Sequence, residues 1–170
     1  MLRAIILLSF LCAGCGSTEP PDWAKTVAAY EIPLPTVKDK AQFLGIMRNQ
    51  AEANGYHVDA ATQDELRAMS DVSPITFSAA VWRGKEDEEA VASAMDFKDN
   101  IGRVWLTFSV GQEPTRVLKF REDLMPLIEK KWPTTLSLPI MPNGAIPLED
   151  DLVLTPTGYI VRSSSTAKYR

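Results

Sequence analysis

The fold class is decided by residues 103–110, whose sequence is RVWLTFSV. Within this stretch Val104, Leu106 and Phe108 alternate with polar, charged or amphipathic residues. A period of two is typical of a strand with one buried face. Residues 75–82, ITFSAAVW, repeat the alternation, and we predict a second strand there.

Between these two strands the pattern is weaker. Val91, Met95 and Phe97 continue the alternation after the charged residues 85–89, although propensity alone also allows a helix over residues 86–95. A strand at this place would give three successive short strands. That arrangement is typical of an antiparallel meander.

Two long helices flank the strands. One is predicted over Val37–Ala53, where Thr36 caps the start and Asn54-Gly55 ends the helix. The other is predicted from Pro114 to Lys131 by the spacing of its apolar residues. Pro126 lies inside this second helix and should kink it or split it in two.

Shorter elements fill the remaining chain. Tyr56–Val58 is predicted as a short strand, and the capping-box spacing of Thr62 and Glu65 predicts a short helix after it. Trp23–Pro35 stays undecided, because its first half fits a helical face while Ile32–Pro35 must be extended.

Prolines recur after residue 133 and restrict that region to short edge strands, such as Leu152–Leu154 and Tyr159–Val161. Together these elements predict an α+β fold, a two-layer sandwich of a small antiparallel sheet with helices packed on one face. We expect a single domain over residues 23–162, followed by a flexible tail over residues 163–170.

The composition excludes several classes of protein. The chain has 170 residues, 45% of them hydrophobic, which is ordinary for a globular protein and argues against intrinsic disorder. A net charge of -4 argues against non-specific binding of nucleic acid. Two cysteines and one histidine are too few for a zinc cluster or a disulfide framework, and we expect no metal and no cofactor.

The first 15 residues have the pattern of an export signal. Arg3 precedes the apolar run Ala4–Leu11, and the small residues Ala13 and Gly14 come before Cys15. The run is much shorter than the roughly 20 residues that span a bilayer. The sequence around Cys15 resembles the lipobox of bacterial lipoproteins. An ordinary secretory signal, cut nearby, is the alternative.

The lipoprotein resemblance implies that residues 1–14 are removed and that Cys15 carries the lipid, so that residues 15–22 form a lipidated tether. Gly16 after the cysteine implies sorting to the outer membrane, with the domain facing the periplasm. Removal of Arg3 with the signal makes the net charge of the mature chain -5.

Candidate catalytic residues are few. His57 is the only histidine, and Asp59 lies two residues later on the same face of a predicted strand, which leaves a hydrolase as a minor alternative. The sequence contains no G-x-S-x-G or H-E-x-x-H motif. The acidic run Glu86–Glu89 lacks the alternation and glycine of a calcium loop, and we interpret it as a solvated hairpin tip.

One surface feature predicts a binding role. Trp82 and Trp105 lie on the faces of their strands that point away from the predicted core, and Arg83 and Arg103 are close in sequence. Aromatic and arginine side chains together are typical of a protein-binding patch. In the alternative interpretation, the proline-rich C-terminal segment folds over this face and buries both indoles.

These features favour a non-catalytic, membrane-anchored envelope lipoprotein that binds a periplasmic or envelope protein. Immunity against a secreted cell-wall-degrading toxin is one role of that kind, and the acidic charge suits a basic partner. An envelope assembly or maintenance scaffold is the alternative, and a hydrolase using His57 is the third hypothesis.

Overall fold

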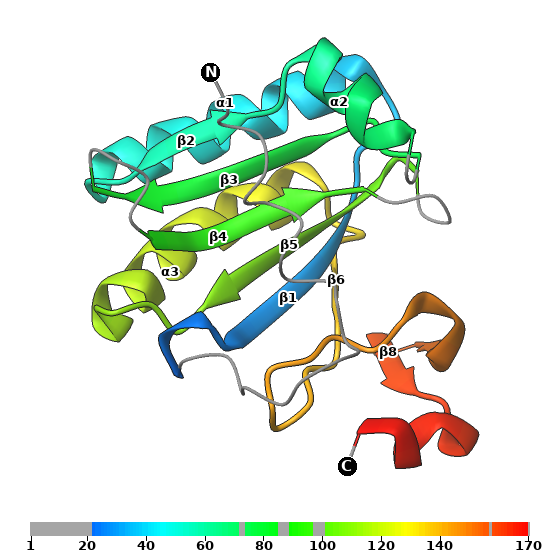
Figure 1. Ribbon diagram of the computed structural model, residues 1–170. Coiled ribbons are helices and arrows are strands. Elements are labelled where there is room, and N and C mark those ends of the chain that lie inside the picture. Colours follow the sequence, from blue (N-terminus) through cyan, green and yellow to red (C-terminus); the bar gives the residue numbers. More distant parts are fainter. Residues whose placement is uncertain (1–21, 72–73, 85–88, 97–100, 157, 170) are drawn as a thin grey trace.

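A computed structural model describes residues 22–71, 74–84, 89–96, 101–156 and 158–169. Its main element is a six-stranded antiparallel sheet with the strand order β2-β3-β4-β5-β1-β6 (Figure 1). The strands are β1 (Thr26–Pro33), β2 (His57–Ala60), β3 (Ser78–Arg83), β4 (Glu89–Met95), β5 (Arg103–Ser109) and β6 (Leu136–Ser137). The helices are α1 (Val37–Ala53), α2 (Gln63–Ser70) and α3 (Pro114–Lys131).

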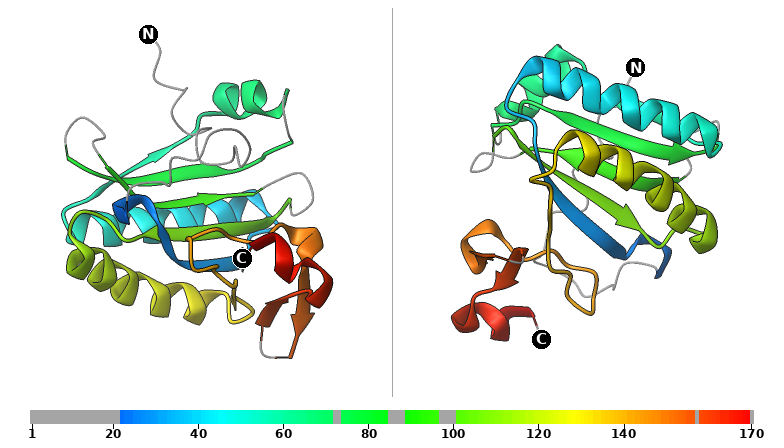
Figure 2. Two further views of the ribbon diagram at one scale, coloured as in Figure 1. Left: turned by 60° about the horizontal axis from the view of Figure 1, so that its bottom comes forward. Right: turned by 180° about the vertical axis from the view of Figure 1, so that it is seen from behind.

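The predicted α+β class is confirmed. Helices α1 and α3 lie side by side on one face of the sheet, as the view from behind in Figure 2 shows. Phe43 of α1 and Phe120 of α3 are fully buried in the core between these layers. Phe108 of β5 meets the Phe120 ring edge-on, with 5.9 Å between the ring centroids. The alternating residues of β5 therefore form the floor on which the helices pack.

The predicted meander of β3, β4 and β5 is confirmed. Residues 89–95 form a strand and not a helix, because Ala92 and Ala94 pair on one side with β3 and on the other with β5. Phe97 and residues 86–88 lie outside the described residues. The undecided segment 23–35 contributes β1, which pairs with β5 from Thr26 to Pro33.

The helix boundaries follow their capping residues. Helix α1 spans Val37–Ala53 as predicted, and the Thr36 side chain accepts a hydrogen bond from the Asp39 amide at 3.1 Å. The capping box of α2 is present, since Thr62 and Glu65 bond reciprocally. These ends are predictable because a cap acts within three residues.

Helix α3 spans Pro114–Lys131 as predicted. It runs unbroken through Pro126, so of the two outcomes predicted for this proline, a kink or a split, the split does not occur. Leu124, Met125 and Ile128 are buried on both sides of the proline, and this packing offsets the backbone hydrogen bond that proline cannot donate. Leu127 is 41% exposed and does not belong to the buried stripe.

The two short strands predicted in the C-terminal region are present. The strands β7 (Leu152–Thr155) and β8 (Gly158–Val161) pair with each other in a separate two-stranded sheet, instead of extending the main sheet. Within the segment predicted as a flexible tail, the 3-10 helix η4 (Ser163–Tyr169) is bonded to Asp151.

Three side chains of η4 make these bonds, namely Ser165 at 2.6 Å, Lys168 at 2.8 Å and Tyr169 at 2.6 Å. These bonds, with Lys168 first, hold the pKa of Asp151 well below its usual range. A short 3-10 helix, η3 (Glu149–Asp151), carries this aspartate. We call the described residues after β6 the C-terminal arm.

Candidate functional site

Trp105 and Arg103 of the predicted patch are engaged by the C-terminal arm. The Trp105 indole nitrogen donates to Glu31 at 3.0 Å, and the Tyr159 hydroxyl of the arm donates to the same carboxylate at 3.0 Å. Arg103 pairs with Glu31 at 3.4 Å and also with Glu149 of the arm. The alternative interpretation has the proline-rich segment burying both indoles, and in the structure Trp105 is half-buried against residues of that segment.

The contacts of this cluster stabilise the attachment of the C-terminal arm to the sheet. Burial would lower the pKa of the Arg103 guanidinium, but the bond to Glu149 and the charge of Glu31 raise it. Burial and the neighbouring Glu31 raise the pKa of the Tyr159 hydroxyl. Ala29, Leu138 and Leu152 form the buried apolar cluster next to Trp105. The charged and apolar contacts together fasten the arm to the sheet.

Replacing Trp105 by alanine is expected to lower the free energy of unfolding by about 2–4 kcal/mol. The change removes the contacts of the half-buried ring with a buried apolar cluster and takes a hydrogen-bond donor from the buried Glu31 carboxylate. Urea denaturation of both proteins measures the difference. Trp82→Ala is the matched control, since Trp82 lies outside both buried clusters and should cost about 1 kcal/mol or less. Equal losses in the two variants would contradict the covered position of Trp105.

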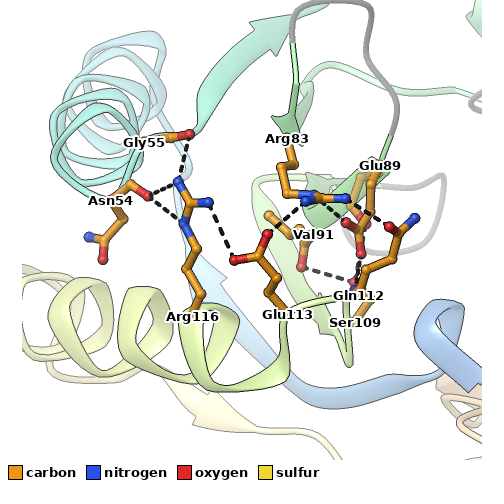
Figure 3. A network of polar contacts seen from close by, with 10 residues as sticks. Asn54, Gly55, Arg83, Glu89, Val91, Ser109, Gln112, Glu113 and Arg116 are labelled. Carbon is orange, nitrogen blue, oxygen red and sulfur yellow. Dashed lines mark hydrogen bonds and ion pairs between the residues drawn. The ribbon is translucent and has the colours of Figure 1, made fainter.

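Arg83 belongs to a different network, at the end of the sheet where α3 begins (Figure 3). Its guanidinium donates to Glu89 at 2.8 Å, to Glu113 at 2.7 Å and to Gln112 at 2.7 Å. The bond to Glu89 is the largest cause that raises the pKa of Arg83. Arg116 continues the network to the end of α1, where it donates to the Asn54 carbonyl at 2.9 Å.

Glu89 corrects the interpretation of the acidic run. Its side chain is fully buried, and it accepts bonds from Arg83 and from the Gln112 amide. Glu89 is therefore the internal partner of a cation and not part of a solvated tip. The run 86–89 gave no sign of this, because its four acidic residues are equivalent until the hairpin register places one of them inside.

The predicted patch is thus divided. Arg103 and Trp105 share one cluster, Arg83 lies in the network at the α3 end, and Trp82 lies on β3 with β4 between it and β5. Trp82 instead pairs with His57 of β2, and Asp59 pairs with Ala80. No serine stands opposite His57 or Asp59 on β3. In the sequence Trp82 and His57 are separate candidates, and the structure brings them together on neighbouring strands.

β2 forms one edge of the main sheet. Its only strand neighbour among the described residues is β3. His57 and Val58 are half-buried, Asp59 is exposed and Trp82 is half-buried beside them. We call His57–Ala60 with Trp82 the β2 edge. Four strand spacings, about 19 Å in all, separate it from β1.

A second surface lies where β1 begins and was not foreseen from the sequence. Two hollows, of about 330 and about 240 Å³, share Val27 and Arg121 in their linings. Val27 is 49% exposed at an irregularity in the β1–β5 register, and Leu118 of α3 is 42% exposed beside the smaller hollow. We call this the Val27 surface, and its residues are Trp23, Val27, Val110, Pro114, Leu118 and Arg121.

Two kinds of site are absent from the described residues, a metal centre and a membrane-spanning helix. No group of three or more His, Cys, Asp or Glu that could hold a metal occurs among them. Within the same residues no helix is long and apolar enough to cross a membrane. Cys15 lies outside the described residues. No family model, no curated protein and no solved structure matches this chain.

Proposed function

We propose that this protein is a bacterial envelope lipoprotein, anchored through lipid on Cys15, that binds another protein and has no catalytic activity. The sequence before Cys15 supports the anchor, because a charged start, a short apolar run and small residues precede the cysteine. The proposed location is the periplasmic face of the outer membrane.

The use of the buried carboxylates supports a non-catalytic role. Glu31, Glu89, Asp96 and Asp151 are all buried, and each accepts hydrogen bonds from other residues of the chain. None of them lines either hollow, where Arg121 is the only charged residue. Catalytic acids and bases need access to substrate, whereas these groups hold elements together.

The observation that carries the binding role is the position of the β2 edge. A strand edge presents backbone donors and acceptors that a second chain can pair with, and an adjacent indole provides an anchor for binding energy. Trp82 stands beside this edge, opposite His57. The edge is on the far side of the sheet from β1, which continues from the tether, so a membrane anchor leaves it accessible.

Photo-crosslinking in the native envelope tests the binding role. A photoreactive residue at exposed Asp59 should give one defined crosslinked protein, and the same residue at exposed Glu129 of α3 should not. Trp82→Ala should reduce the crosslink by about tenfold or more, as expected for loss of a central aromatic contact. Equal crosslinking at both positions, or none at Asp59, would contradict the proposal.

The identity of the crosslinked protein separates the two roles. A soluble, basic, cell-wall-degrading enzyme would support immunity, for which the mature charge of -5 is suited. A resident component of an envelope complex would support the assembly scaffold. His57→Ala addresses the hydrolase hypothesis, because loss of a hydrolytic activity with the crosslink unchanged would favour it.

A further inference from the structure

We infer that the Val27 surface rests on the bilayer that holds the anchor, with its apolar side chains at the interface and Arg121 at the lipid phosphates. The inference rests on the proposed lipid anchor and adds a defined orientation to it. Loosely tethered domains rotate freely, whereas a domain that rests on one surface presents the opposite edge outward. Here the outward edge is β2.

The tether limits how far this surface can move from the lipid. Cys15 lies seven positions before Asp22, the first described residue, and seven extended residues span about 23 Å. The chain after Asp22 is fixed at once to the body of the domain. The Trp23 carbonyl accepts the Gly111 amide at 2.9 Å, and the Lys25 carbonyl accepts the Val110 amide at 2.8 Å. The anchored end therefore emerges beside Val110, within the Val27 surface.

The side chains of the surface suit a lipid interface. Trp23 is 38% exposed, and tryptophan is enriched at the level of the headgroups in membrane proteins. Val27 and Leu118, which line the smaller hollow, provide exposed aliphatic groups. Arg121 is half-buried, and within the described parts of the chain no acidic group pairs with it. An arginine among apolar side chains is suited to a lipid phosphate.

Two ion pairs lie close to this surface in the sequence. Asp22 and Lys25 form an ion pair at 2.7 Å, so together they add no net charge at the start of β1. Asp123 of α3 pairs with Lys119 at 2.5 Å and is likewise neutralised. Arg121 is the one charged residue among the described residues that line the two hollows, and the next residue of α3, Glu122, is exposed.

The size of the surface favours a tethered membrane contact over a protein partner. A stable protein interface buries about 800 Å² on each partner, which needs many more residues than the three large exposed apolar side chains here. A membrane contact made by a tethered domain is intramolecular, and short tethers give effective concentrations on the order of 1 mM. Weak affinity for lipid is then sufficient.

The test supplies the tether chemically. The chain from residue 15 onward contains a single cysteine, Cys15, whose thiol couples to a maleimide lipid in vesicles of phosphatidylethanolamine and phosphatidylglycerol. Lipids brominated in their acyl chains then quench tryptophans that reach the interface. Comparison with Trp23→Phe isolates the signal of Trp23. Because coupling does not depend on cellular lipidation, failure of this test is distinct from failure of the proposed anchor.

We expect brominated lipid to remove about half of the Trp23 emission, as for a surface in contact half of the time. The double variant Val27→Asp, Leu118→Asp should abolish that quenching, and Arg121→Gln should weaken it. Thermal unfolding checks that the double variant folds, and Leu118→Gln alone replaces it if it does not. Trp23 quenching that is absent, or equal in all variants, overturns the inference. A protein crosslink from a photoreactive residue at Leu118 that is lost when Val27→Asp is added, without any lipid quenching, would assign the surface to a protein instead.

Discussion

Replacing Asp96 by alanine is expected to lower the free energy of unfolding by about 3–5 kcal/mol, the range for breaking a buried ion pair. The Asp96 side chain is fully buried and follows β4. It accepts bonds from the Thr76 amide at 2.7 Å, the Phe77 amide at 2.9 Å and the Lys40 ammonium at 3.0 Å. The Gly102 amide is a further donor at 3.3 Å. One carboxylate thus joins α1, the residues before β3 and the turn before β5.

The loss should depend on pH in a defined direction. Burial would raise the pKa of Asp96, but the bonds from Thr76, Lys40 and Gly102 outweigh burial and lower it. A carboxyl group whose pKa is lower in the folded state stabilises the protein above its unfolded pKa of about 3.9. This stabilisation is lost as the pH falls through the lower, folded value. The difference between the native protein and Asp96→Ala should therefore be full at neutral pH and shrink below about pH 4.

Urea denaturation at neutral pH and at several acidic pH values measures both effects. Asp59→Ala is the matched control, because this aspartate is exposed on the edge strand β2. The control should change the free energy of unfolding by no more than about 0.5 kcal/mol. Similar losses for the two variants, or a loss for Asp96→Ala that does not shrink in acid, would contradict the role given to Asp96.

Replacing Cys15 by serine should move the protein almost completely from the membrane fraction to the soluble fraction. Acyl chains bind the bilayer with about 0.8 kcal/mol per buried methylene, so two or more chains hold a protein durably. The substitution replaces the sulfur, to which the diacylglyceryl group would be attached, by a hydroxyl oxygen. Fractionation of cells and incorporation of labelled palmitate measure the change.

Cys12→Ser is the matched control for this experiment. Cys12 lies three residues before Cys15 in the predicted signal peptide and is absent from the proposed mature chain. The control should therefore keep both membrane location and lipid label. The lipid anchor would be eliminated if the Cys15→Ser protein stays in the membrane fraction and the native protein carries no palmitate label.

Local signals account for the elements that could be predicted. Thr36 and Asn54 set the ends of α1, and alternation in residues 103–110 set the faces of β5. β1 escaped prediction because its pattern is interrupted at Val27, where the register with β5 shifts. That irregularity depends on the partner strand, so no window of local sequence contains it.

The candidate surfaces depend on contacts between distant residues. Val27 and Leu118 are far apart in the sequence and look like ordinary core residues, and only the packing of α3 leaves both exposed. Trp82 and Trp105 look equivalent in sequence. Only Trp105 of these two packs against the cluster that contains Leu138 and Leu152 of the C-terminal arm. Coverage of this kind is set by tertiary packing, which periodicity does not report.

The position of β1 also imposes an order on folding. β1 leaves the ribosome before every other strand of the sheet, yet Thr26 pairs with Ser109 and Pro33 pairs with Arg103. Contacts between residues so distant in sequence close large loops and form slowly. β1 therefore cannot pair with β5 until residues 103–109 have been synthesised. For the proposed envelope protein this delay is useful, because a chain that has not closed its sheet can still be threaded through a membrane and complete its fold on the far side.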